Sequence, residues 1–208
     1  LVWTVLLVVF FMFGIPLGLW AGVRRGGAID AGAMFVAVVG ISVPNFVLGP
    51  LLKWIFALEL GWLPESRWVS PASMVLPTLS LSAIYVATIA RLVRSGTVET
   101  LGETYVRTAR AKGLSETRVL LRHVLPGALL PLVSYLGPAA AGLAVGSVVV
   151  ERVFNIPGLG NEFVESAFNR DYTMVMGTVI TYSAILILMN LLSDLLLMAV
   201  DPRVRDQR

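Results

Sequence analysis

The chain contains no cysteine and only one histidine among its 208 residues. Without cysteine it can form no disulfide, no thiolate metal site and no cysteine nucleophile. His123 alone cannot supply a histidine-rich metal cluster. These two absences exclude disulfide-stabilised scaffolds, thiolate enzymes and multi-histidine metal centres before any motif is considered.

Charge is also scarce along the chain. Only 14% of the residues are charged, whereas 57% are hydrophobic and the mean hydropathy is +0.83. A soluble domain typically has about 25% charged and roughly 45–50% apolar residues. The charges are clustered, which leaves the long apolar stretches that a bilayer span requires. The composition predicts an all-α membrane protein. The pI near 9.6 then reflects basic loops rather than nucleic-acid binding.

Five apolar stretches are long enough to cross about 30 Å of hydrocarbon, which takes about 20 helical residues. They are residues 1–23, 31–58, 72–90, 124–150 and 172–200. Pro44 and Pro50 predict kinks in the second span, and Lys53 is expected to snorkel from near its outer end. The sequence starts without Met, inside an apolar run, so we expect a sixth, N-terminal span to be missing from it.

The basic residues gather on one side of these spans. Twelve of the sixteen lie there: Arg24, Arg25, Arg91, Arg94, Arg107, Arg110, Lys112, Arg118, Arg122, Arg203, Arg205 and Arg208. The other side carries the remaining four, Lys53, Arg67, Arg152 and Arg170. The positive-inside rule therefore predicts a multi-pass protein of the cytoplasmic (inner) membrane with a cytoplasmic C-terminus. Residues 91–123, hereafter the basic loop, are then cytoplasmic, and residues 151–171 form an external loop.

The basic loop is expected to contain short helices rather than a flexible linker. Its apolar residues fall on one predicted helical face: Tyr105, Val106, Ala109 and Leu114. Gly113 fits a helix C-terminus, Ser115 can cap the next helix, and Arg118 and Arg122 lie one turn apart on that helix. Such an element suits the groove of a partner protein. From physical chemistry alone, contact with anionic lipid head groups is an equal alternative.

The run Thr108-Ala-Arg-Ala-Lys-Gly113, followed by Leu125-Pro126, resembles the EAA loop of binding-protein-dependent ABC importer permeases. Gly113, Leu125 and Pro126 stand in the register of that motif. Arg107-Thr108-Ala109 replaces the family's Glu-Ala-Ala, and His123 replaces its Ile.

With these departures, the run from Tyr105 to Leu114 is similar to the corresponding run of the first permease of the oligopeptide/dipeptide/nickel importers. Further stretches resemble the same group: Gly61-Trp-Leu-Pro64, Glu151-Arg-Val-Phe-Asn-Ile-Pro-Gly-Leu-Gly160, Asn169-Arg-Asp-Tyr172 and Asp201-Pro-Arg203. The resemblance covers nearly the whole chain.

The resemblance implies a type I ABC importer transmembrane domain with short cytoplasmic coupling helices. It implies a second permease that completes the pore as a heterodimer, two cytoplasmic ATPase subunits and an extracytoplasmic substrate-binding protein. ATP and Mg would be bound by the ATPase subunits, and this chain would bind no cofactor and catalyse no reaction. It has no Gly-x-x-x-x-Gly-Lys-Ser/Thr motif to hold nucleotide phosphates. The residues implied to dock the ATPase are Tyr105, Val106, Arg107, Thr108, Ala109, Arg110, Ala111, Lys112, Gly113 and Leu114, with Leu125 and Pro126 ending the motif.

Two further groups of residues are candidates for packing or for the pore. Gly142 and Gly146 form a Gly-x-x-x-Gly in the fourth span, and we expect a helix-packing seam there. The helical spacing of apolar residues in the external loop predicts an interfacial helix. This helix would act as a gate, as a contact for the binding protein or as a structural cover. Kinked or polar positions give weaker pore or gate candidates: Pro44, Asn45, Tyr135, Pro157 and Gly158.

Asp194 is an acid inside the last span, with Asn190 one turn away. We expect a structural acid that faces another helix, and proton or ion coupling is the alternative. The function that the sequence favours is a non-catalytic permease subunit that imports oligopeptides or dipeptides. The alternatives are a secondary transporter that uses Asp194, and the same ABC machinery importing nickel or another small solute.

Overall fold

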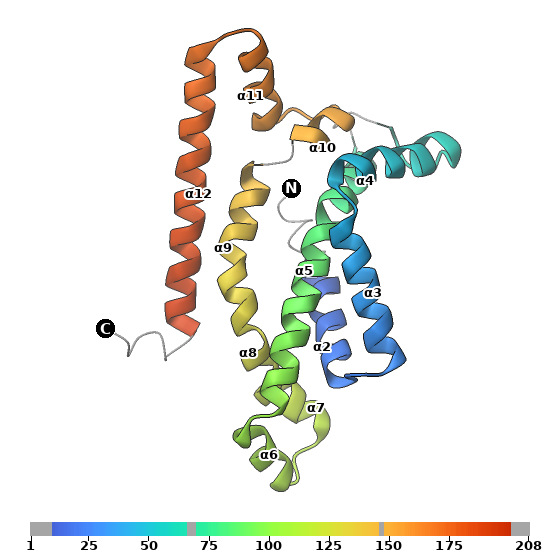
Figure 1. Ribbon diagram of the computed structural model, residues 1–208, viewed down its shortest axis with the longest axis vertical. Coiled ribbons are helices and arrows are strands. Elements are labelled where there is room, and N and C mark those ends of the chain that lie inside the picture. Colours follow the sequence, from blue (N-terminus) through green and yellow to red (C-terminus); the bar gives the residue numbers. More distant parts are fainter. Residues whose placement is uncertain (1–9, 66–69, 146–147, 201–208) are drawn as a thin grey trace. The chain divides into compact units, whose positions relative to one another are not determined.

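The computed structural model describes residues 10–65, 70–145 and 148–200, and these residues form helices without any strand (Figure 1). The α-helices are α2 (Ile15–Val23), α3 (Ala28–Ser42), α4 (Asn45–Leu52), α5 (Val75–Leu101), α6 (Thr104–Ala111), α7 (Glu116–Val119), α8 (Leu125–Ala128), α9 (Leu130–Val145), α10 (Val148–Val153), α11 (Leu159–Phe168) and α12 (Tyr172–Val200). Phe10–Gly14, Lys53–Glu59 and Leu120–Val124 are π-helical, and Pro71–Met74 is a 3-10 helix. The all-α prediction is confirmed.

The chain folds as two compact units. Among the described residues, the first contains those of Val43–Ala83 and Gly137–Leu192, and the second contains residues 10–42, Ile84–Leu136 and residues 193–200. The core of the first unit is built from Ala57, Leu76, Val150 and Phe154. Lys53, which we expected to snorkel, instead donates a hydrogen bond from Nζ to the carbonyl oxygen of Val153 over 3.3 Å. A carbonyl near the C-terminus of α10 is a favourable partner for a cation.

In the second unit, α2 lies against α5 along three glycines spaced four residues apart, Gly14, Gly18 and Gly22. A Cβ atom on Gly18 would lie 2.5 Å from the carbonyl oxygen of Ala90, and one on Gly22 would lie 2.6 Å from Cβ of Thr97. Both distances are far inside van der Waals contact, so any side chain would push the two helices apart. These glycines therefore form the helix-packing seam of this unit.

The seam predicted at Gly142 and Gly146 is not formed within the described part of the chain. Gly142 is exposed on α9, and Gly146 lies outside the described residues. The repeated Gly-x-x-x-Gly of residues 14–22 was equally visible in the sequence, but the pattern alone does not say which copy meets a neighbour.

Several predicted spans are interrupted helices. The second breaks at Val43–Pro44, because Pro44 has an extended backbone (φ −62°, ψ 143°) as the residue that precedes α4. Pro50 lies inside α4 without interrupting it. The fourth predicted span is divided among α8, α9 and α10. By length and composition, two described helices can cross a membrane, or four if each bent pair counts as one span.

Candidate functional site: the basic loop

The basic loop is an ordered helical element whose first part continues α5. That helix runs on to Leu101, eleven residues beyond the predicted end of its span at residue 90. The chain then turns at Gly102 and enters α6 at Thr104. In Figure 1, α6 and α7 lie beyond the end of α5, next to the start of α8. The loop thus presents α6 and α7 at the end of a long helix.

Gly113 ends α6 in the way that the sequence predicted. Its φ of +75° is in the left-handed region, which a residue with a Cβ adopts only at a cost. The amide of Gly113 donates to the carbonyl of Arg110 over 2.9 Å, and that of Leu114 donates to the carbonyl of Ala109 over 3.4 Å. This pair of bonds is the Schellman pattern of helix termination. It directs Leu114 back toward the helix it follows.

The apolar residues of the loop pack against one another. Val106 and Ala109 of α6 are buried with Val119 and Val124, and Leu101, Leu114 and Leu120 pack against this cluster. Val106, Val119 and Val124 are 0% exposed, and Ala109 is 4% exposed. The prediction that Val106 and Ala109 face a partner is therefore wrong for this structure. Their side chains hold α6 onto α7 and the start of α8.

The opposite side of α6 is exposed and carries three basic residues. The exposed residues of this helix and its end are Thr104, Tyr105, Arg107, Thr108, Arg110, Ala111, Lys112 and Gly113. Arg110 forms an exposed ion pair with Glu116, with Nε and Oε1 at 2.9 Å. Such a pair contributes only about 0–1 kcal/mol, so it orders the surface more than it stabilises the fold.

The next helix begins where the sequence indicated. Ser115 has the extended backbone of a helix N-cap, and its carbonyl oxygen accepts the amide of Val119 over 3.0 Å. Its hydroxyl makes no capping hydrogen bond to the described backbone, so only the position of the cap is confirmed. Arg118 and Arg122 are both exposed. Pro126 lies in the first turn of α8, where its missing amide hydrogen costs nothing.

An ion pair that the sequence did not indicate ties α5 to the turn between α2 and α3. Asp30 is 4% exposed and accepts hydrogen bonds from Arg94 Nε at 2.5 Å and from Arg94 Nη2 at 2.7 Å. The amide of Gly26 donates to the same carboxylate over 2.8 Å. The guanidinium hydrogen bond, followed by that of Gly26, lowers the pKa of Asp30 to about 2. The arginines closest to Asp30 in the sequence are Arg24 and Arg25. Nothing in the sequence indicates that its partner is instead Arg94, 64 residues away.

The external loop contains the predicted helix, α11, and Glu151 holds its start. The Glu151 carboxylate accepts the amide of Asn161 over 2.8 Å, and Arg152 Nε donates to Asn161 Oδ1 over 3.2 Å. Burial raises the pKa of Glu151, and the amides of Asn161 and Gly160 partly oppose that rise. A Cβ on Gly158 would collide with this carboxylate, so Gly158 permits the contact.

The remaining pore candidates occupy three places. Pro157 directly precedes Gly158, the residue before α11, and Pro44 precedes Asn45, the first residue of α4. Tyr135 is half-buried on α9 beside Thr88 of α5. Their roles in a pore stay predictions.

Asp194 is exposed within the part of the chain that the structure describes. It lies on α12 and has no hydrogen bond or ion pair within the described residues, whereas its neighbour Ser193 is buried and donates to the carbonyl of Val133 over 3.1 Å. The expected contact of Asp194 with another helix is not made among residues 10–65, 70–145 and 148–200, and its role stays a prediction.

Comparison with known proteins places the chain in a family. Residues 14–206 match the model of the binding-protein-dependent transport system inner membrane component. The chain is similar to the dipeptide transport system permease protein DppB of Bacillus subtilis (strain 168), with 47% identity over 199 residues, 96% of this chain and 65% of that protein.

Two oligopeptide transport system permease proteins OppB are also similar to it. That of Haemophilus influenzae is 42% identical over 201 residues, 94% of this chain and 66% of the relative. That of Escherichia coli (strain K12) is 42% identical over 196 residues, with shares of 93% and 64%. The chain thus spans slightly less than two thirds of the length of these relatives. By this match over nearly all of its length, and by its apolar helices, the chain belongs to the membrane-protein family of binding-protein-dependent transport system inner membrane components.

Proposed function

We propose that this chain is the pore-forming permease subunit of an ATP-driven importer that carries peptides across the cytoplasmic membrane. Its family and the dipeptide and oligopeptide permeases similar to it support this assignment. In the proposed assembly a second permease completes the pore, and two separate ATPase subunits bind ATP and Mg. An extracytoplasmic binding protein delivers the peptide. In this proposal the chain itself hydrolyses no ATP. The excess of basic residues in the 91–123 loop supports a cytoplasmic location for that loop and for the C-terminus.

The observation that carries the mechanism is the self-supporting basic loop. Because Val106 and Ala109 are buried in the loop's own core, α6 keeps its shape without a partner and exposes Arg107, Ala111 and Lys112. A rigid surface loses less conformational entropy when a partner docks on it. The loop is also continuous with α5, so a displacement of α6 by the ATPase can reach a membrane helix directly. ATP binding shifts the pore between conformations only if the ATPase states differ in their affinity for them.

The docking role can be tested with Ala111→Glu in the full-length permease, expressed with the ATPase and permease subunits encoded beside it. Ala111 is exposed on α6, so the change leaves the loop core intact. Thr117→Glu is the matched control, because it adds the same charge to an exposed position on α7. Ala109→Glu is a poor probe, since it would bury a carboxylate in the core.

We expect Ala111→Glu to lower peptide uptake and ATPase recovery at least tenfold, which corresponds to about 1.4 kcal/mol, and Thr117→Glu to lower them less than twofold. Equal effects of both variants would place docking elsewhere in the loop. A permease that transports peptide when purified alone would refute the ATP-driven assignment and favour a secondary transporter.

A further inference from the structure

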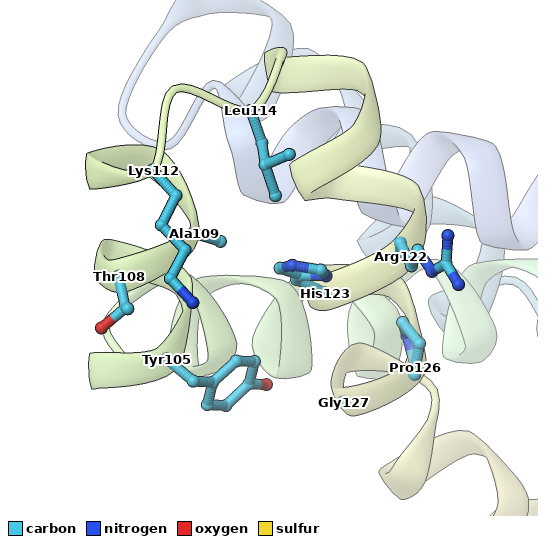
Figure 2. A pocket seen from close by; sticks show the side chains of 9 residues that line it. All are labelled: Tyr105, Thr108, Ala109, Lys112, Leu114, Arg122, His123, Pro126 and Gly127. Atoms are coloured by element: carbon cyan, nitrogen blue, oxygen red, sulfur yellow. The ribbon is translucent and has the colours of Figure 1, made fainter.

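A groove of about 640 Å³ lies beside α6, on the side away from Arg107. One wall of the groove is α6, and the other is the chain that leads into α8 (Figure 2). The apolar part of the groove lining includes Ala109 and Leu114. The volume is within the roughly 300–1,000 Å³ that small-ligand sites occupy. No carboxylate lines it.

The polar groups of the groove suit an anion. In Figure 2 the amino group of Lys112 and the ring of His123 point into the same space from opposite walls, with the hydroxyl group of Tyr105 nearby. Arg122 lines the rim, with its guanidinium directed outward. Among the described residues, the side chains of Arg94 and Arg110 have carboxylate partners, but the side chains of Lys112 and His123 have no hydrogen bond or ion pair. A positive charge and a ring N–H donor therefore face a space that no carboxylate lines.

The position of the groove indicates where the anion comes from. Pro126 lies in the first turn of α8, and the fourth predicted span begins at residue 124. From this predicted boundary we infer that the groove lies at the level of the lipid head groups. Leu121 is 57% exposed and Tyr105 is 48% exposed at this level. Tyrosine is typical of the interface between lipid and water, and an exposed leucine there is covered by acyl chains.

We propose that this groove binds the phosphate of an anionic phospholipid from the cytoplasmic leaflet, with Lys112 and His123 as the phosphate ligands. The apolar wall at Ala109 and Leu114 takes the glycerol end of the lipid. Basic pockets of membrane proteins on the cytoplasmic side bind anionic head groups in this way. An acidic segment of a soluble partner is the competing occupant, and the position of Pro126 near the predicted start of the fourth span favours the lipid. The orientation rests on the proposed topology, but the lipid site does not depend on which solute is transported.

The test is native mass spectrometry of the full-length permease with its partner subunits, titrated with phosphatidylglycerol or with phosphatidylcholine. We expect preferential binding of phosphatidylglycerol to the wild type, about fivefold weaker binding in Lys112→Gln, and a similar loss in His123→Ala. Arg107→Gln is the matched control, because it removes the same charge from the same helix but outside the groove. It should change lipid affinity less than twofold, while unchanged melting temperatures show that the variants are folded.

Three results would overturn the proposal. The first is equal affinity for the two lipids, and the second is an equal loss in Arg107→Gln. The third is displacement of bound phosphatidylglycerol by inorganic phosphate or by excess ATPase subunit. Displacement by phosphate assigns the groove to a free anion, and displacement by the ATPase assigns it to the partner protein. If Arg107→Gln abolishes transport but still binds lipid, the lipid groove and the ATPase-docking surface are separate sites.

Discussion

A single carboxylate, Asp30, holds the turn between α2 and α3 against α5. It is buried, and its oxygens are satisfied by the Arg94 guanidinium and the Gly26 amide. Removing one member of such a pair leaves the other charge without a partner in a site that water reaches poorly. Because α5 continues into the basic loop, this pair also fixes the helix from which that loop extends.

We predict that Asp30→Asn and Arg94→Gln each lower the free energy of unfolding by about 1–3 kcal/mol. Their double variant should cost no more than either single change, because each removes the same interaction. Thermal unfolding of the detergent-solubilised protein measures all three. Additive losses would show that the two residues act separately.

The pH dependence of this pair follows from the lowered pKa of Asp30. The value of about 2 in the folded protein lies below the roughly 3.9 of an unfolded aspartate, so the stabilisation is complete above about pH 4. It is lost as the pH falls through about 2. Between pH 5 and pH 8 the difference in stability between the wild type and Asp30→Asn should therefore stay constant, and it should shrink in acid.

At the scale of whole helices, the glycines of α2 decide how closely α2 approaches α5. Without a hydrophobic effect to drive association inside lipid, helices gain from close van der Waals packing, which small residues allow. Gly96 gives a second close approach, since a Cβ there would lie 2.6 Å from the carbonyl oxygen of Ala128 on α8. In the second unit, α2 and α8 thus pack closely against α5 because glycines at the contacts carry no side chain.

We predict that Gly18→Ala destabilises the protein by about 1–3 kcal/mol, because the added methyl group meets the Ala90 carbonyl and the helices must separate. Gly32→Ala on α3 is the matched control, since a Cβ there has no neighbour within 4 Å. It should be neutral, or stabilising by up to about 1 kcal/mol through helix propensity. Melting temperatures of both variants check this, and equal shifts would contradict the seam.

Two helix ends, one in each unit, are defined by local contacts. The left-handed Gly113 ends α6 and sends Leu114 into the loop core, while Glu151 satisfies amides at the start of α11. Both devices use backbone hydrogen bonds that a helix end otherwise leaves without partners. They give short helices a defined direction, which a helix of eight or ten residues does not gain from its own propensity.

For the whole molecule, the most telling feature is how little of α12 is covered. Only 6% of its most apolar 18-residue window is buried, compared with 44% for Pro71–Leu101. Lipid can cover its leucines, but the carboxylate of Asp194 on the same helix is costly in hydrocarbon. A second protein chain, such as the second permease of the proposed assembly, would supply polar partners for it.

We therefore predict that Asp194→Leu leaves membrane insertion of this subunit intact but lowers recovery of the second permease in co-purification at least fivefold, or about 1 kcal/mol. Leu195→Ala, on the next exposed position of α12, is the control and should change recovery less than twofold. Intact assembly with abolished transport would instead identify Asp194 as an ion or proton site.

The sequence alone determined the membrane class and the position of the basic loop along the chain, and it predicts an excess of positive charge on one side of the membrane. These depend on composition and on local chain chemistry: apolar runs of membrane length, and a glycine where a helix must end in the left-handed region. The register of Gly113 with Leu125-Pro126 likewise indicated the family without any contact being known.

Tertiary structure decided which surfaces of those elements are available. Val106 and Ala109 are apolar whether they pack inside the loop or face a partner protein. Only the packing of α7 and the chain before α8 against them shows that they are buried. Of two Gly-x-x-x-Gly patterns, only the one at residues 14–22 meets α5 among the described residues. The partners Asp30 and Arg94 are 64 residues apart. Contacts between distant segments depend on how the helices are arranged, and local periodicity carries no information about that arrangement.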